Sequence, residues 1–159
     1  MIRLEFKSLI PKKNKSMGLK FAFAVNDTGV FEKKHFGEAD KFLIYREKDN
    51  SLVLDRELKN TARDFDEEQQ HGSRKKADAI INLLKSDDIN VLVSMQFGKN
   101  IKVINDFFIP IIIHSDSVED VVKIIGKQYH WISEEWEHKN SDYMLFSIKQ
   151  GIMKHPLKD

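Results

Sequence analysis

The chain has 159 residues, of which 41% are hydrophobic and 32% are charged, and its formal net charge is +1. These values are typical of a globular protein of one domain, and the small net charge argues against a nucleic-acid-binding groove or a membrane-surface patch. No apolar run approaches the ~20 residues of a membrane-spanning helix, and the basic N-terminal segment lacks the apolar core of a signal peptide. The absence of cysteine excludes disulfides, zinc–thiolate sites and thiolate-held iron–sulfur clusters. We therefore expect a cytoplasmic protein.

The first half of the chain predicts antiparallel strands. Residues 19–25 are apolar and rich in Phe and Ala, as in a buried strand, and the Asn-Asp-Thr-Gly sequence at 26–29 predicts a turn. Two further apolar runs, 41–46 and 51–58, flank a group of turn residues and predict a β-hairpin whose second strand lies near the sheet edge. The polar and acidic residues 60–70 predict a loop.

The second half alternates helical patterns with short apolar runs. Such alternation predicts right-handed crossovers and a parallel core, so that the whole sheet is mixed. Ser73 and Ser117 are candidate helix caps, and Gly126 weakens the middle of the last helix. The predicted helices cover residues 73–85, 101–108 and 118 to about 136, and the predicted strands cover 89–94 and 109–114.

Both ends of the chain contain segments of strand-like composition, at residues 2–9 and 143–148. We expect these two segments to pair with each other or to add to an edge of the sheet. The alternative is that both are partly disordered, as chain termini often are.

The most informative motif lies between the first predicted strand and the hairpin, where His35, Phe36 and Gly37 follow one another. Neutral imidazole is the commonest metal ligand in proteins, and open α/β sheets bind ligands beyond the carboxyl ends of their strands. His35 is therefore the leading candidate for a ligand-binding residue. On spacing alone, a histidine that caps a turn through a backbone hydrogen bond is the favoured alternative.

Two other positions could bind an anion because each lies where a helix begins. His71 precedes the predicted helix 73–85, and Gly98, Lys99 and Asn100 precede the next one. The first turn of a helix offers free N–H groups and the positive end of its dipole. The alternatives are an exposed loop histidine and a turn with a surface lysine.

The remaining histidines give weaker signals. His114 ends a predicted strand and is expected to be structural. His130, Glu134 and His138 have i,i+4 spacing that could share a divalent metal, but a solvated helix face is the favoured interpretation.

No reaction type has positive support in the sequence. A two-metal nuclease needs several convergent carboxylates, and Asp27 and Asp55 lack a third partner and a basic groove. A Ser-His-Asp order, a phosphate-binding loop and a dinucleotide fingerprint are all missing. We therefore expect that the protein is not an enzyme.

Several segments, taken in order, resemble the dinitrogenase iron-molybdenum cofactor biosynthesis family, whose members include nitrogenase accessory factors. They are FAFAVNDTG, HFGEADKFLIY, the HG that opens a helix, INVLVSMQFGKNI and IPIIIHSDSVEDVVKII. The resemblance implies an α/β fold of ribonuclease-H-like topology, with a mixed five-stranded sheet flanked by helices. It divides the chain into an N-terminal extension (1–18), the family domain (19–129) and a C-terminal extension (130–159).

The resemblance also implies a function: non-enzymatic binding or transport of a metallocluster, either an iron–sulfur cluster or a precursor of the iron-molybdenum cofactor. The cluster would be exchanged with a donor or acceptor protein. It implies a site formed by His35, Phe36, Gly37 and Gly98, with His35 as a metal ligand and His71 as a second one.

The chain departs from the family pattern after its middle strand, where many members carry a glycine-rich segment. Here the bulky residues Met95 and Phe97 are expected to narrow the cavity. The alternative function is therefore a protein-interaction or small-anion-binding module that has lost the cluster. The aromatic residues of the C-terminal extension could then form an apolar patch and a homodimer; they are Trp131, Trp136, Tyr143 and Phe146.

Overall fold

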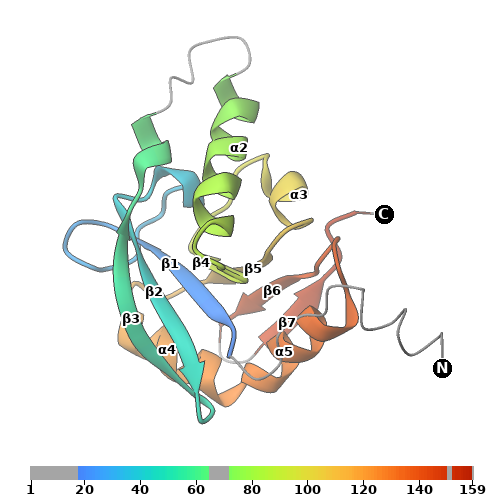
Figure 1. Cartoon of the computed structure of the whole chain (residues 1–159). Coiled ribbons are helices and arrows are strands. Elements are labelled where there is room, and N and C mark those ends of the chain that lie inside the picture. The colour runs from blue at the N-terminus through green and yellow to red at the C-terminus, as the bar shows by residue number, and fades with distance from the viewer. Residues whose placement is uncertain (1–17, 65–71, 150–151, 159) are drawn as a thin grey trace, which may run out of the picture.

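One mixed β-sheet lies between two layers of helices in the computed structural model, which describes residues 18–64, 72–149 and 152–158 (Figure 1). The strand order is β3-β2-β1-β4-β5-β6-β7. β1, β4, β5 and β6 run parallel to one another, whereas β2, β3 and β7 are antiparallel to their neighbours. The strands are β1 (Lys20–Val25), β2 (Lys41–Lys48), β3 (Ser51–Lys59), β4 (Val91–Ser94), β5 (Ile109–Ile113), β6 (Leu145–Ile148) and β7 (Ile152–His155).

The α/β class and the mixed sheet are confirmed, but the predicted number of five strands is wrong because the described residues form a sheet of seven. The two additional strands, β6 and β7, come from the expected C-terminal extension and continue the same sheet beyond β5. The prediction that residues 143–148 join the sheet is thus confirmed, although β6 is an inner strand and not an edge. Residues 2–9 lie outside the described part of the chain, and the ribonuclease-H-like topology stays a prediction.

The alternation of side chains along β1 explains why helices cover both faces of the sheet. Phe21 and Phe23 point to one face and Ala22 and Ala24 to the other, and all four are buried. The phenylalanines share their core with α4 and α5, and the alanines share theirs with α2 and α3 (Figure 1). The helices are α2 (Gly72–Lys85), α3 (Ile101–Ile104), α4 (Val118–Lys127) and α5 (Tyr129–His138), with 3₁₀ turns η1 (Phe36–Glu38) and η2 (Thr61–Asp64).

The turns predicted in the first half are confirmed. Gly29 has a φ of +84°, and the carboxamide oxygen of Asn26 accepts hydrogen bonds from the N–H groups of Thr28 and Val30. Asp49 and Asn50 both have positive φ, which is the geometry of a two-residue hairpin turn. β3 is an edge strand of the described sheet, as predicted. The predicted loop 60–70 is partly wrong because residues 61–64 form η2; residues 65–70 lie outside the description.

Two helix predictions need correction. α2 begins at Gly72, so Ser73 lies inside the helix and not at its N-cap. α3 is a single turn of 4 residues and does not extend to residue 108. The physical reason is Asn105, which is fully buried and whose carboxamide donates a hydrogen bond of 2.8 Å to the carbonyl of Tyr143. This long-range contact fixes the chain between α3 and β5.

The last predicted helix is two helices. α4 is capped as expected, since the hydroxyl of Ser117 accepts a hydrogen bond of 3.2 Å from the N–H of Asp120. The helix ends at Lys127, where Gln128 leaves helical geometry with φ −111° and ψ 16°, and α5 then begins.

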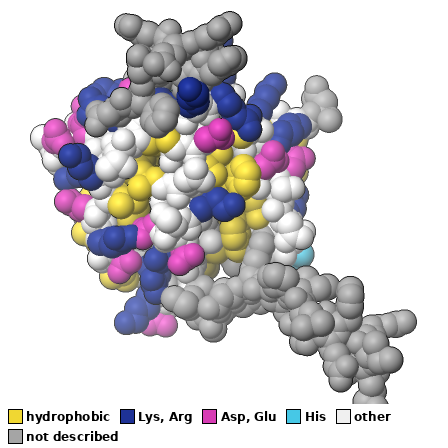
Figure 2. Space-filling model, turned by 45° about the horizontal axis from the view of Figure 1, so that its top comes forward, with side chains coloured by type: hydrophobic (Ala, Val, Ile, Leu, Met, Phe, Trp, Pro, Cys, Tyr) yellow, Lys and Arg dark blue, Asp and Glu magenta, His cyan; other side chains and the backbone are white. Residues whose placement is uncertain are grey.

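On the face drawn in Figure 2, basic and acidic side chains are interspersed around hydrophobic ones, and neither charge dominates.

Candidate functional site

The loops that follow the parallel strands β1 and β4 meet at one edge of the sheet. After β1 the chain returns to this edge at His35, which forms an isolated parallel bridge with Gln96 beyond the end of β4. The N–H of Phe36 donates a hydrogen bond of 2.9 Å to the carbonyl of Gln96. The parallel pairing of β1 and β4 therefore places the histidine of the first loop beside the second loop.

Phe36 anchors the turn that carries the histidine. Its ring is buried and stacks on the rings of Phe42, at a centroid distance of 4.9 Å, and Phe97, at 5.6 Å. Because Phe36 points into the core, the preceding His35 stays exposed at the surface of the turn. The His-Phe-Gly order thus combines one anchoring side chain with one accessible imidazole.

The segment between β1 and His35 is held by charged and amide groups. The Glu32 carboxylate accepts a hydrogen bond of 2.7 Å from the Asn26 amide and lies 2.9 Å from the Lys34 ammonium. These contacts lower the pKa of Glu32 and raise the pKa of Lys34, so both groups stay charged at neutral pH. Buried Phe31 adds an apolar anchor to this loop.

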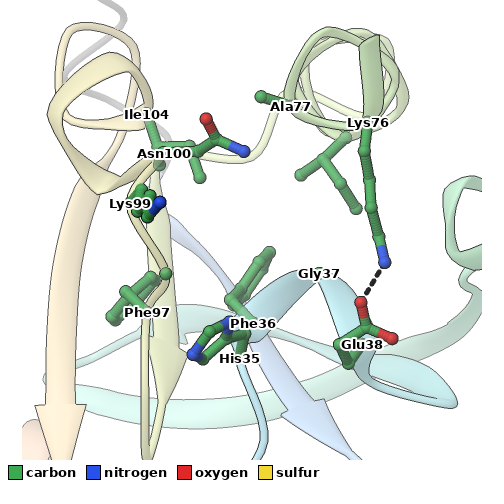
Figure 3. Close-up of a pocket in the computed structure, with 12 residues that line it drawn as sticks. His35, Phe36, Gly37, Glu38, Lys76, Ala77, Phe97, Lys99, Asn100 and Ile104 are labelled. Carbon is green, nitrogen blue, oxygen red and sulfur yellow. Dashed lines mark hydrogen bonds and ion pairs between the residues drawn. The ribbon is translucent and has the colours of Figure 1, made fainter. Parts of the chain in front are cut away.

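A cavity of about 320 Å³ opens between this turn, α2 and the segment that enters α3 (Figure 3). Figure 3 shows Lys76 reaching down from α2 to Glu38, and the Asn100 carboxamide pointing into the space between α3 and α2. The lining residues come from three short segments: His35, Phe36, Gly37 and Glu38; Lys76, Ala77 and Ile80; and Phe97, Gly98, Lys99, Asn100 and Ile104.

The two glycines that line the cavity differ in the space that they leave for a side chain. A Cβ atom placed on Gly98 would lie 2.9 Å from Nδ1 of His35, closer than real Cβ contacts allow, so the imidazole occupies the space that a side chain would need. A Cβ placed on Gly37 would be in ordinary contact, at 3.6 Å, with Cε of Lys76. Gly98 is therefore specifically required for the observed position of the imidazole.

The charged groups of the cavity lie on opposite walls. Lys76, on α2, is buried with 5% exposure and forms an ion pair with Glu38 of η1. Lys99 is exposed on the other wall. Sequence reasoning missed Lys76, although its position one helical turn before the buried Ile80 already indicated that it lies on the inner face of the helix.

Asn60 supports the turn from behind and was also missed, because it lies in a segment predicted as a solvated loop. Its side chain is 3% exposed, and its amide donates hydrogen bonds to the carbonyls of Gly37, at 3.0 Å, and Ala39, at 2.8 Å. The preceding β3 carries Asn60 into this position. No sequence motif marks the residue.

Four of the predicted site residues line this one cavity: His35, Phe36, Gly37 and Gly98. His71 lies outside the described residues. Phe97 lines the cavity as expected, but the expectation for Met95 is wrong, because its side chain packs against the core on the other face of the sheet. Residues two positions apart share a face in a continuous strand, but β4 ends at Ser94 and the chain bends at Met95, so Met95 and Phe97 lie on different faces.

The other histidines in the described part of the chain do not line this cavity. His114 is exposed after β5 and does not line it. His130, Glu134 and His138 are exposed on α5. In the described ranges, no three histidine or carboxylate side chains come together as a group that could bind a metal ion.

None of the described helices is long and apolar enough to cross a membrane. No curated protein shows a match to the chain.

The sequence profile of the family described as "Dinitrogenase iron-molybdenum cofactor" matches residues 17–128, which is more than half of the chain and contains every residue that lines the cavity. The match ends before α5, β6 and β7. The chain therefore belongs to the dinitrogenase iron-molybdenum cofactor family.

Proposed function

We propose that the protein binds a metallocluster, either an iron–sulfur cluster or a precursor of the iron-molybdenum cofactor, and carries it without transforming it. The observation that carries this proposal is the meeting of His35, Phe36, Gly37 and Gly98 around one cavity, within the part of the chain that matches the family. Family membership relates the chain to the iron-molybdenum cofactor, and the cavity is where an imidazole is available.

The chemistry of the lining suits a cluster that is bound and released. Imidazole is a good ligand for iron, and His35 offers its ring at an accessible position. Because the chain has no cysteine, the bond through His35 is exchangeable, which suits a carrier better than a permanent electron-transfer centre.

The proposal includes a partner protein that delivers or receives the cluster. His35 borders both the cavity and a second, more open hollow lined by Lys33, Lys34 and Arg63. A ligand bound to the imidazole is therefore reachable from outside. His71 as a second ligand remains part of the proposal from family resemblance.

The alternative, an interaction module that has lost the cluster, loses much of its original support. Tyr143 and Phe146 belong to the core, and Trp136 packs against that core. Of the four aromatic residues that suggested an apolar patch, Trp131 is the one with a largely exposed side chain, at 43%. A single exposed indole is common on protein surfaces and does not define an interface.

The test is anaerobic reconstitution of the purified full chain with iron and sulfide or with a cluster donor, followed by absorption spectra and metal analysis. We expect bound iron and sulfide in the wild type and loss of both in His35→Ala. His114→Ala is the matched control because it removes an exposed histidine from the same sheet edge without touching the cavity. Equal stoichiometric loading of all three proteins would refute the assignment of His35.

A further inference from the structure

The cavity contains a buried cation that forms an ion pair with a much more exposed carboxylate. Lys76 is 5% exposed and is anchored on α2, a helix of 14 residues. Its stem passes over Gly37, where a Cβ would lie 3.6 Å from Cε of the lysine. A buried ammonium group needs a nearby negative charge, and Glu38 supplies it (Figure 3).

Glu38 is held much less firmly than Lys76. Its side chain is 39% exposed, and it belongs to η1, a 3₁₀ turn of 3 residues. A rotation about its side-chain bonds moves the carboxylate into water, where it is fully solvated. Lys76 cannot make the equivalent move because its stem is enclosed. The two partners of the ion pair are therefore unequal: the cation is fixed and the anion is replaceable.

From this asymmetry we propose that Lys76 is an anion-binding group of the cavity and that Glu38 occupies the position of the anion until a ligand displaces it. The ligand class is a compact multivalent anion, either a free oxyanion such as phosphate or the negatively charged face of a metallocluster. This inference deepens the proposed function, since it concerns the same cavity, but it assigns a different residue and a different interaction from the bond through His35.

Two features of the opposite wall fit an anion at this position. Lys99 adds a second cation, and the Asn100 carboxamide points into the cavity. Glu38 is the one carboxylate among the described residues that line the cavity. At the same distance, the Coulomb attraction to Lys76 is larger for a multivalent anion than for the single charge of Glu38.

The test is titration of the full chain with inorganic phosphate, measured by calorimetry and by the phosphate dependence of the melting temperature. We expect Lys76→Met to weaken phosphate binding on the order of tenfold or more, as the loss of a charge-assisted hydrogen bond does. Glu38→Gln should strengthen binding, because the internal competitor has been removed. Lys75→Met is the matched control, since Lys75 is the exposed neighbour on the same helix, and its phosphate affinity should equal that of the wild type.

The opposite signs of the two variants make the proposal falsifiable even if one of them is unstable. Phosphate binding that is absent in the wild type, unchanged in Lys76→Met, or weakened in Glu38→Gln would overturn it. The result is independent of cluster loading: His35→Ala should lose the cluster and keep phosphate. Failure of reconstitution in the wild type would refute the proposed function and leave the phosphate result standing.

Discussion

The indole ring of Trp136 stacks on the phenol ring of Tyr143, with 5.1 Å between the ring centroids and 15° between the ring planes. Trp136 lies on α5, and Tyr143 lies in the segment that leads into β6 (Leu145–Ile148), so the stack joins the last helix to the strand that pairs with β5. Tyr143 is 1% exposed and shares a core with Phe21 and Phe23 of the central strand β1. The C-terminal segment is therefore an integral part of the hydrophobic core.

Removing residues 130–159 should abolish cooperative unfolding. The deletion takes away β6 and β7 and leaves β5 paired on one side only, as an edge strand. It also removes Tyr143, Phe146 and Ile148 from the core. Each buried large side chain contributes roughly 2–5 kcal/mol, which together exceeds the margin of a typical domain. Chemical denaturation followed by circular dichroism is the measurement. A truncated chain that unfolds cooperatively at the wild-type midpoint would show that the family domain is stable by itself.

Gly98→Ala should displace the imidazole of His35 and reduce cluster loading. The added methyl group would lie 2.9 Å from Nδ1 and 3.3 Å from Cε1 of the ring. Because His35 is exposed, the ring can turn away, so the free energy of unfolding should change by no more than about 1 kcal/mol. Iron and sulfide per chain after reconstitution, together with a denaturation curve, separate the two effects.

Gly126→Ala is the matched control for that substitution. A Cβ at Gly126 would meet the carbonyl oxygen of Asn50 at 3.5 Å, an ordinary contact, and the residue lies on α4, away from the cavity. Alanine favours the helix, so we expect the free energy of unfolding to rise by about 0.5–1 kcal/mol and cluster loading to stay unchanged. Reduced loading in this variant as well would assign the Gly98→Ala effect to a general disturbance.

Asn60→Ala should destabilise the protein and loosen the turn that carries His35. The substitution leaves the carbonyls of Gly37 and Ala39 without their donor, at a cost of about 1–3 kcal/mol for buried groups. The free energy of unfolding and the cluster stoichiometry should both fall. Asn82→Ala, at an exposed position on α2, is the control and should leave both values nearly unchanged. Equal stability of the two variants would contradict the role of Asn60.

Stability should decrease at alkaline pH because of the tyrosines. Burial raises the pKa of Tyr45 and Tyr129, and that of Tyr143 to about 12, from an ordinary value of 10.0. The fold favours the neutral phenol, so this contribution is complete below pH 10.0 and is lost as the pH rises toward 12. Denaturant unfolding across this range measures the slope, and Tyr143→Phe should make it shallower. An unchanged slope in that variant would contradict burial of a neutral Tyr143 as its source.

The sequence by itself determined those features that depend on neighbours along the chain. Alternating apolar residues predict β1, and turn residues at Asp49 and Asn50 predict the hairpin, because backbone geometry decides both locally. The cap at Ser117 is equally local. The ordered motifs also predicted the family and the residues His35, Phe36, Gly37 and Gly98 that line the cavity.

Only the tertiary structure decided which distant residues meet. β7 gave no signal, because its sequence Ile-Met-Lys-His is neither an apolar run nor an alternating pattern, and its pairing with β6 defines it. Lys76 pairs with Glu38, and Asn60 supports Gly37, across sequence separations of 38 and 23 residues. Such contacts exist because the parallel sheet brings the loops after β1 and β4 to one edge and α2 packs over them. Sequence patterns act over one or two turns and cannot specify which distant segments come together. The contacts of Lys76, Glu38 and Asn60 are therefore visible only in the tertiary structure.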